Sequence, residues 1–433
     1  MHHNVKNPLH SGKSVPPFML EAMSDLHATR TPADDCQPES ASAPATFTDL
    51  LVTGGAGFIG ANFVHRTLQT RSDVRILMVD AMTYAANPDN LATTDGVPLT
   101  EAFPGRFSFS QLDIADAPKL HTLISEWVND LPATGMRAAI VHFAAESHND
   151  NSLLDPGIFA RTNVEGTVNL CEAAVQHGIH LHHISTDEVF GDLALDDPAR
   201  FTVETPYAPS SPYSASKASA DHFVRAFVRS RGLSATISNC SNNYGPRQHP
   251  EKFIPRQITG LIEGEKPRLY GTGDNVRDWI HVDDHNDAVW AILDAVAAHV
   301  RETDGCLGAH DRGARTVEDA HSAVRSESRL VEKGQTFLIG ANGERSNLEV
   351  VQDLLEAFGR ETNDFVHVTD RPGHDRRYAI DPSSIETLGW KPKYTDFRAG
   401  LEATVNWYRD NERWWREARS ASEKKYRQTE KEI

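Results

Sequence analysis

Two spacings of apolar residues alternate along the chain between residues 49 and 231. Short continuous apolar runs are typical of buried strands, whereas longer stretches with apolar residues three or four apart predict helices. The strand-like runs cover residues 49–53, 74–79, 138–143 and 181–185, and the helix-like stretches cover residues 59–68, 164–176 and 213–231. Strands that alternate with helices predict an α/β fold built on a doubly wound parallel sheet.

The pattern changes after residue 241. Loops with proline and glycine separate short helical segments, a strand-like run at 337–340 and an amphipathic stretch at 347–358. This irregular character is typical of a smaller, substrate-binding part of an α/β protein.

Three segments lack a regular pattern. Residues 1–46 are rich in proline, serine, alanine, aspartate and histidine, which predicts a disordered tail; the alternative is a docking element around Phe18-Met19-Leu20. The polar segment 301–334 is long for a connection inside a compact domain, so we expect a surface insertion, with a lid over the site as the alternative. The charged residues 416–433 predict a solvated helix end or tail.

Composition narrows the classes of function. The 433 residues carry a formal net charge of −18, which argues against general affinity for nucleic acid. No apolar run approaches the roughly 20 residues that cross a bilayer, and the polar N-terminus has no hydrophobic signal core. The cysteines form no C-x-x-C pair, so neither a metal site nor a disulfide framework is indicated; they are Cys36, Cys171, Cys240 and Cys306. We therefore expect a cytoplasmic protein without a membrane or metal partner.

A glycine-rich segment, Thr53-Gly54-Gly55-Ala56-Gly57-Phe58-Ile59-Gly60, follows the first strand and opens a helix. In this context Gly54 and Gly55 permit a tight turn, Gly57 lets the backbone approach a pyrophosphate, and Gly60 lets helix and strand pack closely. The helix N-terminus then offers N–H donors to the phosphates.

A carboxylate supports the same site from the second strand. Asp80 ends that strand about 20 residues further on, where it can hold the ribose hydroxyls of a dinucleotide. It would repel a 2′-phosphate, so the pattern predicts NAD rather than NADP. Asp113-Ile114 follows another strand-like segment and is a candidate adenine contact; without that context it would be an ordinary turn.

The candidate chemistry lies in Ser185-Thr186-Asp187-Glu188 and in the Tyr-x-x-x-Lys pair of Tyr213 and Lys217. On a helix this spacing places the ammonium one turn from the phenol. A nearby ammonium and a nicotinamide cation would both lower the phenol pKa, so that it could take a proton from a sugar hydroxyl as hydride leaves. The alternatives are a surface pair for the tyrosine and lysine and an exposed acidic turn for the two carboxylates.

At this point the chain resembles the extended short-chain dehydrogenases/reductases, and more narrowly the dTDP-glucose 4,6-dehydratases. The resemblance covers residues 48 to 410 except the insertion. It is carried by T-G-G-A-G-F-I-G-A-N-F, V-H-F-A-A-E-S-H, I-S-T-D-E-V-F-G-D-L, Y-S-A-S-K-A-S-A-D-H, S-N-N-Y-G-P, P-E-K-F-I-P, G-T-G-D-N-V-R-D-W-I-H-V-D-D-H and R-P-G-H-D-R-R-Y-A-I-D.

The resemblance implies oxidation of dTDP-glucose at C4, loss of water across C5 and C6, and return of hydride to C6. Glu188 would remove the C5 proton, a protonated Asp187 would donate to the departing hydroxyl, and Thr186 would bond the C4 oxygen beside Tyr213. Sugar epimerases of the superfamily usually have small uncharged residues at positions 187 and 188. The product would be a 4-keto-6-deoxy sugar, for rhamnose or another deoxysugar.

The resemblance also implies two sets of binding residues. The NAD contacts are Gly54, Gly57, Phe58, Ile59, Gly60, Asp80, Thr83, Asp113, Ile114, Ala144, Ala145, Thr162, Tyr213, Lys217 and Asn243. The nucleotide-sugar contacts are Ser147, Thr186, Asn242, Lys252, Phe253, Arg268, Tyr270, Arg277, Asn342, His374 and Tyr378. Arginine forks match phosphate oxygens, and Arg277 is the best candidate for the diphosphate.

Two departures from the family pattern stand out. Many members continue the A-E-S-H motif with Val-Asp-Arg-Ser, whereas this chain has Asn149-Asp150-Asn151-Ser152. Many members also have proline where Arg268 stands, which leaves the contacts to the nucleotide base open.

We therefore expect a Rossmann-type NAD domain at 47–240, to which some later segments return, and a mainly substrate-binding domain at 241–415 that contains the insertion. The family implies a homodimer that packs helices such as 164–176 and 213–231. The rival interpretations are a UDP- or GDP-sugar dehydratase or epimerase, and a non-catalytic NAD-sensing protein that keeps the fold.

Overall fold

The computed structural model describes residues 46–131, 138–307, 331–370 and 375–429, which all belong to one compact unit, Pro44–Ile433. Its centre is a seven-stranded sheet in the order β10-β6-β5-β4-β1-β2-β3, and every pairing in it is parallel. The strands are β1 (Asp49–Thr53), β2 (Arg75–Asp80), β3 (Phe107–Gln111), β4 (Ala138–His142), β5 (His180–Thr186), β6 (Ala235–Cys240) and β10 (Thr336–Ile339). The predicted doubly wound parallel sheet is confirmed.

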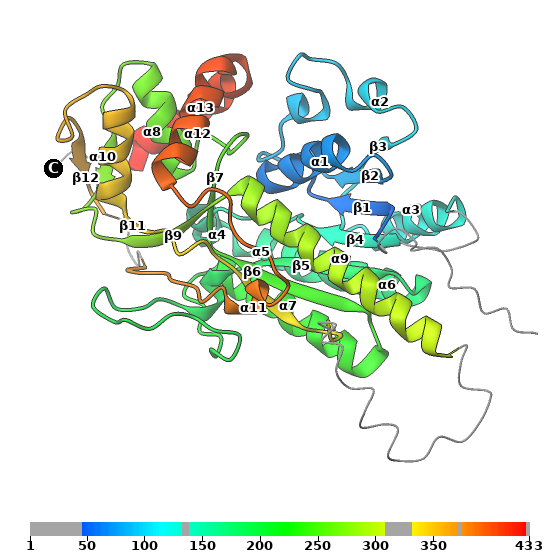
Figure 1. Cartoon of the computed structure of the whole chain (residues 1–433). Coiled ribbons are helices and arrows are strands. Elements are labelled where there is room, and N and C mark those ends of the chain that lie inside the picture. Colours follow the sequence, from blue (N-terminus) through cyan, green and yellow to red (C-terminus); the bar gives the residue numbers. More distant parts are fainter. Residues whose placement is uncertain (1–45, 132–137, 308–330, 371–374, 430–433) are drawn as a thin grey trace, which may run out of the picture. The chain divides into compact units, whose positions relative to one another are not determined.

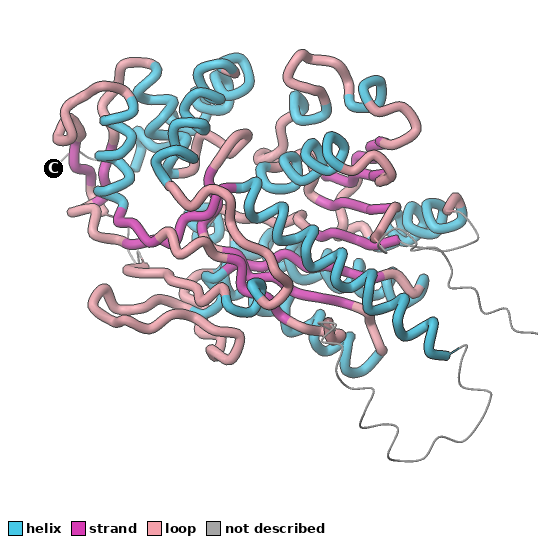
Figure 2. The backbone as a smooth tube through the Cα atoms, viewed as in Figure 1, coloured by secondary structure: helices cyan, strands magenta, loops and turns pink. Residues whose placement is uncertain are grey.

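Alternate residues of β1 show why helices cover both faces of this sheet. Leu50 and Val52 belong to a core with α1 (Phe58–Thr70) and α9 (Val282–Leu307). Leu51 points to the opposite face, into a core with α3 (Ala117–Asn129), α6 (Gly166–His177) and α7 (Pro212–Arg231). Side chains of a strand alternate between faces, so an unbroken apolar run requires cover on both. Figures 1 and 2 show the strands of the sheet between these helices.

A smaller α/β part follows β6. It has a three-stranded sheet of β11 (Glu344–Ser346), β9 (Val276–His281) and β7 (Asn242–Tyr244), and a two-stranded sheet of β12 (Val366–Val368) and β8 (Arg268–Tyr270). The helices α8 (Phe253–Ile262), α10 (Asn347–Ala357), α12 (Phe397–Asp410) and α13 (Glu412–Thr429) share one apolar core with β7, β8 and β9. The strand β10 returns to the edge of the large sheet, beside β6.

Short elements make the remaining connections. They are η1 (Pro88–Leu91), α2 (Leu99–Ala102), α4 (Asn149–Leu154), α5 (Pro156–Phe159), the π-helical η2 (Ala160–Glu165), η3 (Asp187–Phe190) and α11 (Ser383–Glu386). None of the helices in the described part of the chain is both long and apolar enough to cross a bilayer.

The limits of the expected insertion at 301–334 need correction. Helix α9 continues through Leu307, and at the other end Val331 is buried in the core with α1 and α9. The Gly334 amide also donates to the Ala235 carbonyl at 2.7 Å, which fixes the approach to β10. Residues 308–330, and residues 1–45 of the tail predicted at 1–46, lie outside the described residues.

Of the two expectations for residues 416–433, a helix end is confirmed for residues 416–429, which continue helix α13, but this helix is not fully solvated. Trp415, Arg419 and Ser422 are buried, at a spacing that places them on one face of the helix. Arg419 is 3% exposed and bonds the carboxylates of Glu263 at 2.8 Å and Glu265 at 2.5 Å. At least one of the charged residues of this stretch, Arg419, is therefore buried in ion pairs with the segment that follows α8.

We predict that Arg419→Ala lowers the free energy of unfolding by about 2–3 kcal/mol, because it removes a buried cation from several carboxylates. Arg416→Ala on the same helix is the matched control. Arg416 is 59% exposed, so its loss should change stability by no more than about 0.5 kcal/mol. Urea unfolding of both variants checks this, and equal effects would contradict the packed helix.

Candidate active site

The glycine segment turns between β1 and α1 as its sequence predicts. Gly54 has a φ of +72°, and a Cβ there would lie 2.5 Å from the Ala144 nitrogen. A Cβ at Gly60 would lie 2.3 Å from the Gly54 carbonyl oxygen. Gly57 caps α1 without a side-chain hydrogen bond, so the first N–H groups of the helix remain available to a phosphate.

Asp80 has a second function that the sequence did not indicate. Its carboxylate accepts hydrogen bonds from the Ala56 amide at 2.9 Å and from the Met82 amide at 2.8 Å. Burial raises the pKa of this carboxyl, and the two amides oppose that shift. Asp80 therefore braces the glycine segment against the end of β2 as well as bordering the cavity where a ribose would bind.

A cavity of about 340 Å³ lies along the carboxyl ends of β1, β2, β4 and β5. In open α/β sheets ligands bind at this edge. The structure brings every predicted NAD contact to it: Gly54, Gly57, Phe58, Ile59, Gly60, Asp80, Thr83, Asp113, Ile114, Ala144, Ala145, Thr162, Tyr213, Lys217 and Asn243. The residues present thus fit a dinucleotide, beside a turn whose close backbone contacts leave no room for side chains at positions 54 and 60.

The five predicted catalytic side chains border the same cavity: Thr186, Asp187, Glu188, Tyr213 and Lys217. The first is the last residue of β5, and the two carboxylates form the first turn of η3. The tyrosine and lysine lie in the first two turns of α7, whose start is fixed by a capping box on Ser211. The end of β5 and the start of α7 therefore present their side chains to the same cavity.

Electrostatics separate the two carboxylates. Asp187 is 1% exposed, and burial together with the Glu188 and Asp278 charges raises its pKa well above the ordinary value. Its Oδ2 has no hydrogen-bond partner among the described residues. Glu188 is half-buried; burial raises its pKa too, but a hydrogen bond from the Asn149 amide opposes the shift. The arrangement favours a neutral Asp187 beside a Glu188 that ionises more readily.

The expected depression of the Tyr213 pKa is not a property of the protein without its cofactor. Burial and the Glu188 charge raise the pKa of Tyr213 well above its ordinary value. Lys217 donates to the Ile184 carbonyl at 2.8 Å, and burial lowers its pKa to about 8. The phenol is therefore neutral here, and only added positive charge could make it a base near neutral pH.

A second cavity, of about 350 Å³, adjoins the first, and Glu188 borders both. Seven of the predicted substrate contacts line it: Ser147, Asn242, Lys252, Phe253, Tyr270, Arg277 and Tyr378. The Asn242 Oδ1 is buried and has no partner among the described residues, as expected of a group that receives a ligand. Arg277 lies over the Tyr378 ring, 4.4 Å from its centroid, and is 8% exposed.

Two of the described substrate contacts that the sequence predicted do not border these cavities. Asn342 is exposed at a turn with a φ of +54°, and its side chain bonds Arg200 instead. Arg268 borders neither cavity; its backbone pairs with the Gln257 side chain. His374 lies outside the described residues. Asn342 and Arg268 are therefore not among the residues that border the two cavities, and their direct contact with a substrate stays a prediction.

Other residues of the site were missed from the sequence. Asn149 bonds Glu188, and Asp278, 1% exposed with a pKa raised to about 6 by burial, adds charge near Asp187. Glu251 borders both cavities and a third one beside them. The P-E-K-F motif could have indicated Glu251, because it lies next to Lys252, but the other two have no local signal.

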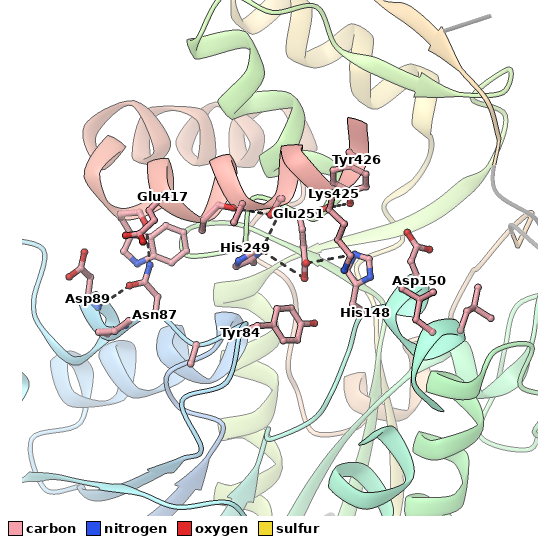
Figure 3. A pocket seen from close by; sticks show the side chains of 18 of the residues that line it. Tyr84, Asn87, Asp89, His148, Asp150, His249, Glu251, Glu417, Lys425 and Tyr426 are labelled. Carbon is pink, nitrogen blue, oxygen red and sulfur yellow. Dashed lines mark hydrogen bonds and ion pairs between the residues drawn. The ribbon is translucent and has the colours of Figure 1, made fainter. Parts of the chain in front are cut away.

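The third cavity, of about 1040 Å³, is shown in Figure 3. Helix α13 forms one side with Glu417, Lys425 and Tyr426, and Tyr84 lies on the opposite side. The Tyr426 hydroxyl donates to the Glu251 carbonyl at 2.7 Å. The C-terminal helix thus forms part of the approach to the substrate cavity.

A glycine cradle on a parallel sheet, with a Tyr-x-x-x-Lys helix facing the same cavity, defines an extended short-chain dehydrogenase/reductase. Comparison with known proteins narrows this class. The family described as GDP-mannose 4,6 dehydratase matches residues 51–404. A dTDP-glucose 4,6-dehydratase of Mycolicibacterium smegmatis is 51% identical over 380 residues, which cover 88% of this chain and 98% of the relative. The chain therefore belongs to the dTDP-glucose 4,6-dehydratase family.

More distant relatives and solved structures agree. The dTDP-glucose 4,6-dehydratase of Neisseria meningitidis is 40% identical, over 86% of this chain and 96% of its own length. The Streptomyces venezuelae enzyme of the same name, solved with NAD and TYD bound, is 38% identical with a TM-score of 0.69, over 86% of this chain and 100% of its own. A UDP-glucose 4-epimerase of Thermotoga maritima, at 24% identity, 84% of this chain, 99% of its own and a TM-score of 0.65, shares the fold.

The glycine segment gives a prediction that separates folding from binding. A Cβ at Gly57 would meet its nearest neighbour at 3.5 Å, an ordinary contact, but it would stand where a pyrophosphate approaches. We expect Gly57→Ala to keep the melting temperature and to raise the Kd for NAD at least about tenfold. Gly60→Ala should lower both stability and affinity, because its Cβ clashes with the Gly54 carbonyl.

Thermal unfolding without ligand and titration with NAD check both variants. Wild-type affinity for NAD in Gly57→Ala would contradict this placement of the pyrophosphate.

Proposed function

We propose that the protein dehydrates dTDP-glucose to dTDP-4-keto-6-deoxyglucose, as a hydro-lyase with NAD as its cofactor. One observation carries the proposal: Asp187 and Glu188 lie side by side at a cavity that also holds Tyr213 and Lys217, in a chain 51% identical to dTDP-glucose 4,6-dehydratases. NAD held by the glycine segment and Asp80 would supply reversible hydride transfer, from C4 of the sugar and later to C6.

The first step needs a base at the C4 hydroxyl. Tyr213 would take that proton, and Thr186 would donate a hydrogen bond to the same oxygen. Lys217, with a pKa of about 8, is largely cationic near neutral pH and supplies part of the positive charge that a phenolate requires. The resulting C4 ketone acidifies the C5–H.

The second step needs an acid and a base of different protonation state at neighbouring positions. Glu188 would remove the C5 proton, and neutral Asp187 would donate to the departing C6 hydroxyl as water. The raised pKa of Asp187 fits the acid, and the Asn149 hydrogen bond to Glu188 fits the base. The proton on Glu188 then returns to C5 as hydride returns to C6.

The nucleotide diphosphate would bind in the second cavity. Arg277 and Lys252 bring positive charge to its lining, although the chain as a whole is acidic. Asn242 would bond the sugar or the diphosphate through its unpartnered oxygen. Phe253, Tyr270 and Tyr378 offer apolar and aromatic surface for the sugar and base.

The rival activities are less well supported. An epimerase moves hydride off and onto one carbon and requires no acid and base beside Tyr213, so it gives no reason for Asp187 and Glu188. The UDP-sugar epimerases among the neighbours share the fold at lower identity than the dTDP-glucose dehydratases. A non-catalytic NAD sensor would not need all five reactive side chains at one cavity.

We also propose a homodimer in the cytoplasm. Helix α7 carries Phe223, which is 43% exposed, and the neighbouring α4 exposes Leu153 and Leu154. Such apolar side chains are suited to an interface. Cys171 and Cys240 are buried free thiols, which is compatible with a reducing compartment.

The activity is tested with purified protein, NAD and dTDP-glucose, and the 4-keto-6-deoxy product is followed by its ultraviolet absorbance in alkali. We expect turnover by the wild type and roughly 10²–10⁴-fold slower dehydration by Glu188→Gln, because the amide cannot accept the C5 proton. The same variant should still reduce some bound NAD, since C4 oxidation precedes proton removal.

Glu204→Gln, on an exposed loop, is the matched control and should match the wild type. Absence of product from wild-type protein would exclude the proposed activity, and full dehydration by Glu188→Gln would exclude this residue as the base.

The assembly is tested by light scattering coupled to size exclusion. We expect twice the chain mass of 47.9 kDa for the wild type and a shift toward the monomer for Phe223→Asp, which places a charge on the proposed interface. Val203→Asp, at a position 42% exposed on a loop, should leave the dimer intact. A monomeric wild type would contradict the proposal.

A further inference from the structure

The side chain of Asn149 is held between two elements of the active site. It is the first residue of α4, and its Nδ2 donates to Glu188 Oε2 at 2.9 Å. Its Oδ1 accepts from Ser211 Oγ, also at 2.9 Å. The amide therefore links the helix-capping serine of α7 to the carboxylate of η3.

The acceptor character of Glu188 decides which end of the amide faces it. An ionised carboxylate only accepts hydrogen bonds, so the NH₂ group of Asn149 points to Glu188 and its Oδ1 points to Ser211. Ser211 Oγ accepts the Ser214 backbone N–H at 3.0 Å as the cap of α7, and its own proton can go to Asn149 Oδ1 or to Ser214 Oγ, which is also 3.0 Å away. The start of the helix that carries Tyr213 therefore accommodates this orientation of Asn149.

The Asn149 amide holds Oε2 of the Glu188 carboxylate, and Oε1 is the oxygen that it does not contact. A carboxylate accepts hydrogen bonds in its ionised form, so a fixed N–H donor favours ionisation over protonation. Burial acts in the opposite direction on Glu188, and so does the charge of Asp375. Lys252 and Arg277 add more distant positive charge.

We propose that Asn149 is a positioning residue: its amide holds Oε2 of Glu188, keeps the carboxylate ionised, and leaves Oε1 to act as the base. This inference rests on the proposed dehydratase function and deepens it. The valine that the family resemblance implies at this position could not donate such a bond, so Asn149→Val is the substitution that tests the contact.

The test is the pH dependence of kcat with dTDP-glucose. In Asn149→Val the pKa of Glu188 rises. As the pH is lowered, Glu188 is therefore protonated earlier, and activity falls at a higher pH than in the wild type. We expect the acidic limb to move up by about one unit, a tenfold change in the protonation equilibrium. Asn149→Asp keeps the shape, retains the acceptor for Ser211 and places a like charge beside Glu188, so its shift should be at least as large.

A second readout separates this role from general damage to the site. In a single turnover, reduction of bound NAD should proceed at the wild-type rate in Asn149→Val, while exchange of the C5 proton with deuterated solvent slows about tenfold. Asn151→Val is the matched control from the same helix; its oxygen contacts Lys425 and not Glu188. It should show wild-type values in both measurements.

These measurements test the role of Asn149 separately from the proposed dehydratase function. Wild-type protein that gives no product from dTDP-glucose overturns the proposed function. An active wild type whose acidic limb is unmoved in both Asn149→Val and Asn149→Asp overturns the role of Asn149 alone. Equal slowing of NAD reduction and C5 exchange in these variants would also overturn it, because that result indicates a merely structural part.

Discussion

The burial of Asp187 is the constraint on which the rest of the site depends. A carboxylate that is 1% exposed is costly to ionise unless cations or donors surround it. Here one oxygen meets only the Thr186 hydroxyl at 3.3 Å, and the other has no partner among the described residues. Glu188 and Asp278 add negative charge to the same region. The neutral acid is the form that this environment stabilises, and an elimination requires a neutral acid at the leaving hydroxyl.

Glu188, the next residue in the chain, has different surroundings from Asp187, and these suit it to act as a base instead of an acid. Asp187 and Glu188 are neighbours in the single turn of η3, so the backbone brings both side chains to the same end of β5. Glu188 differs because it reaches the junction of the two cavities and receives the Asn149 amide. One turn of backbone thus presents an acid and a base without any need for distant residues to approach each other.

The sequence predicted the fold and the site correctly where a local pattern of residues is required by the backbone conformation. The glycine segment, Asp80 and the Tyr213–Lys217 spacing each describe a turn, a strand end or a helix face, and the structure brings them to one cavity. The alternation of apolar runs likewise predicted the parallel sheet. The prediction was weak where function depends on packing between distant segments. Asn342 matched a family position but turns outward to Arg200, and no local signal marks Asp278 as a neighbour of Asp187.

The burial of the C-terminal helix α13 also could not be predicted from a local pattern, and this helix contacts an element of the active site. Its high charge gave no sign that Trp415, Arg419 and Ser422 are buried on one face, so the sequence predicted a solvated helix end or tail. In the fold, Lys425 contacts Asn151 of α4, the short helix that begins with Asn149. Because this contact joins residues more than two hundred positions apart, no local pattern could have placed α13 beside the active site.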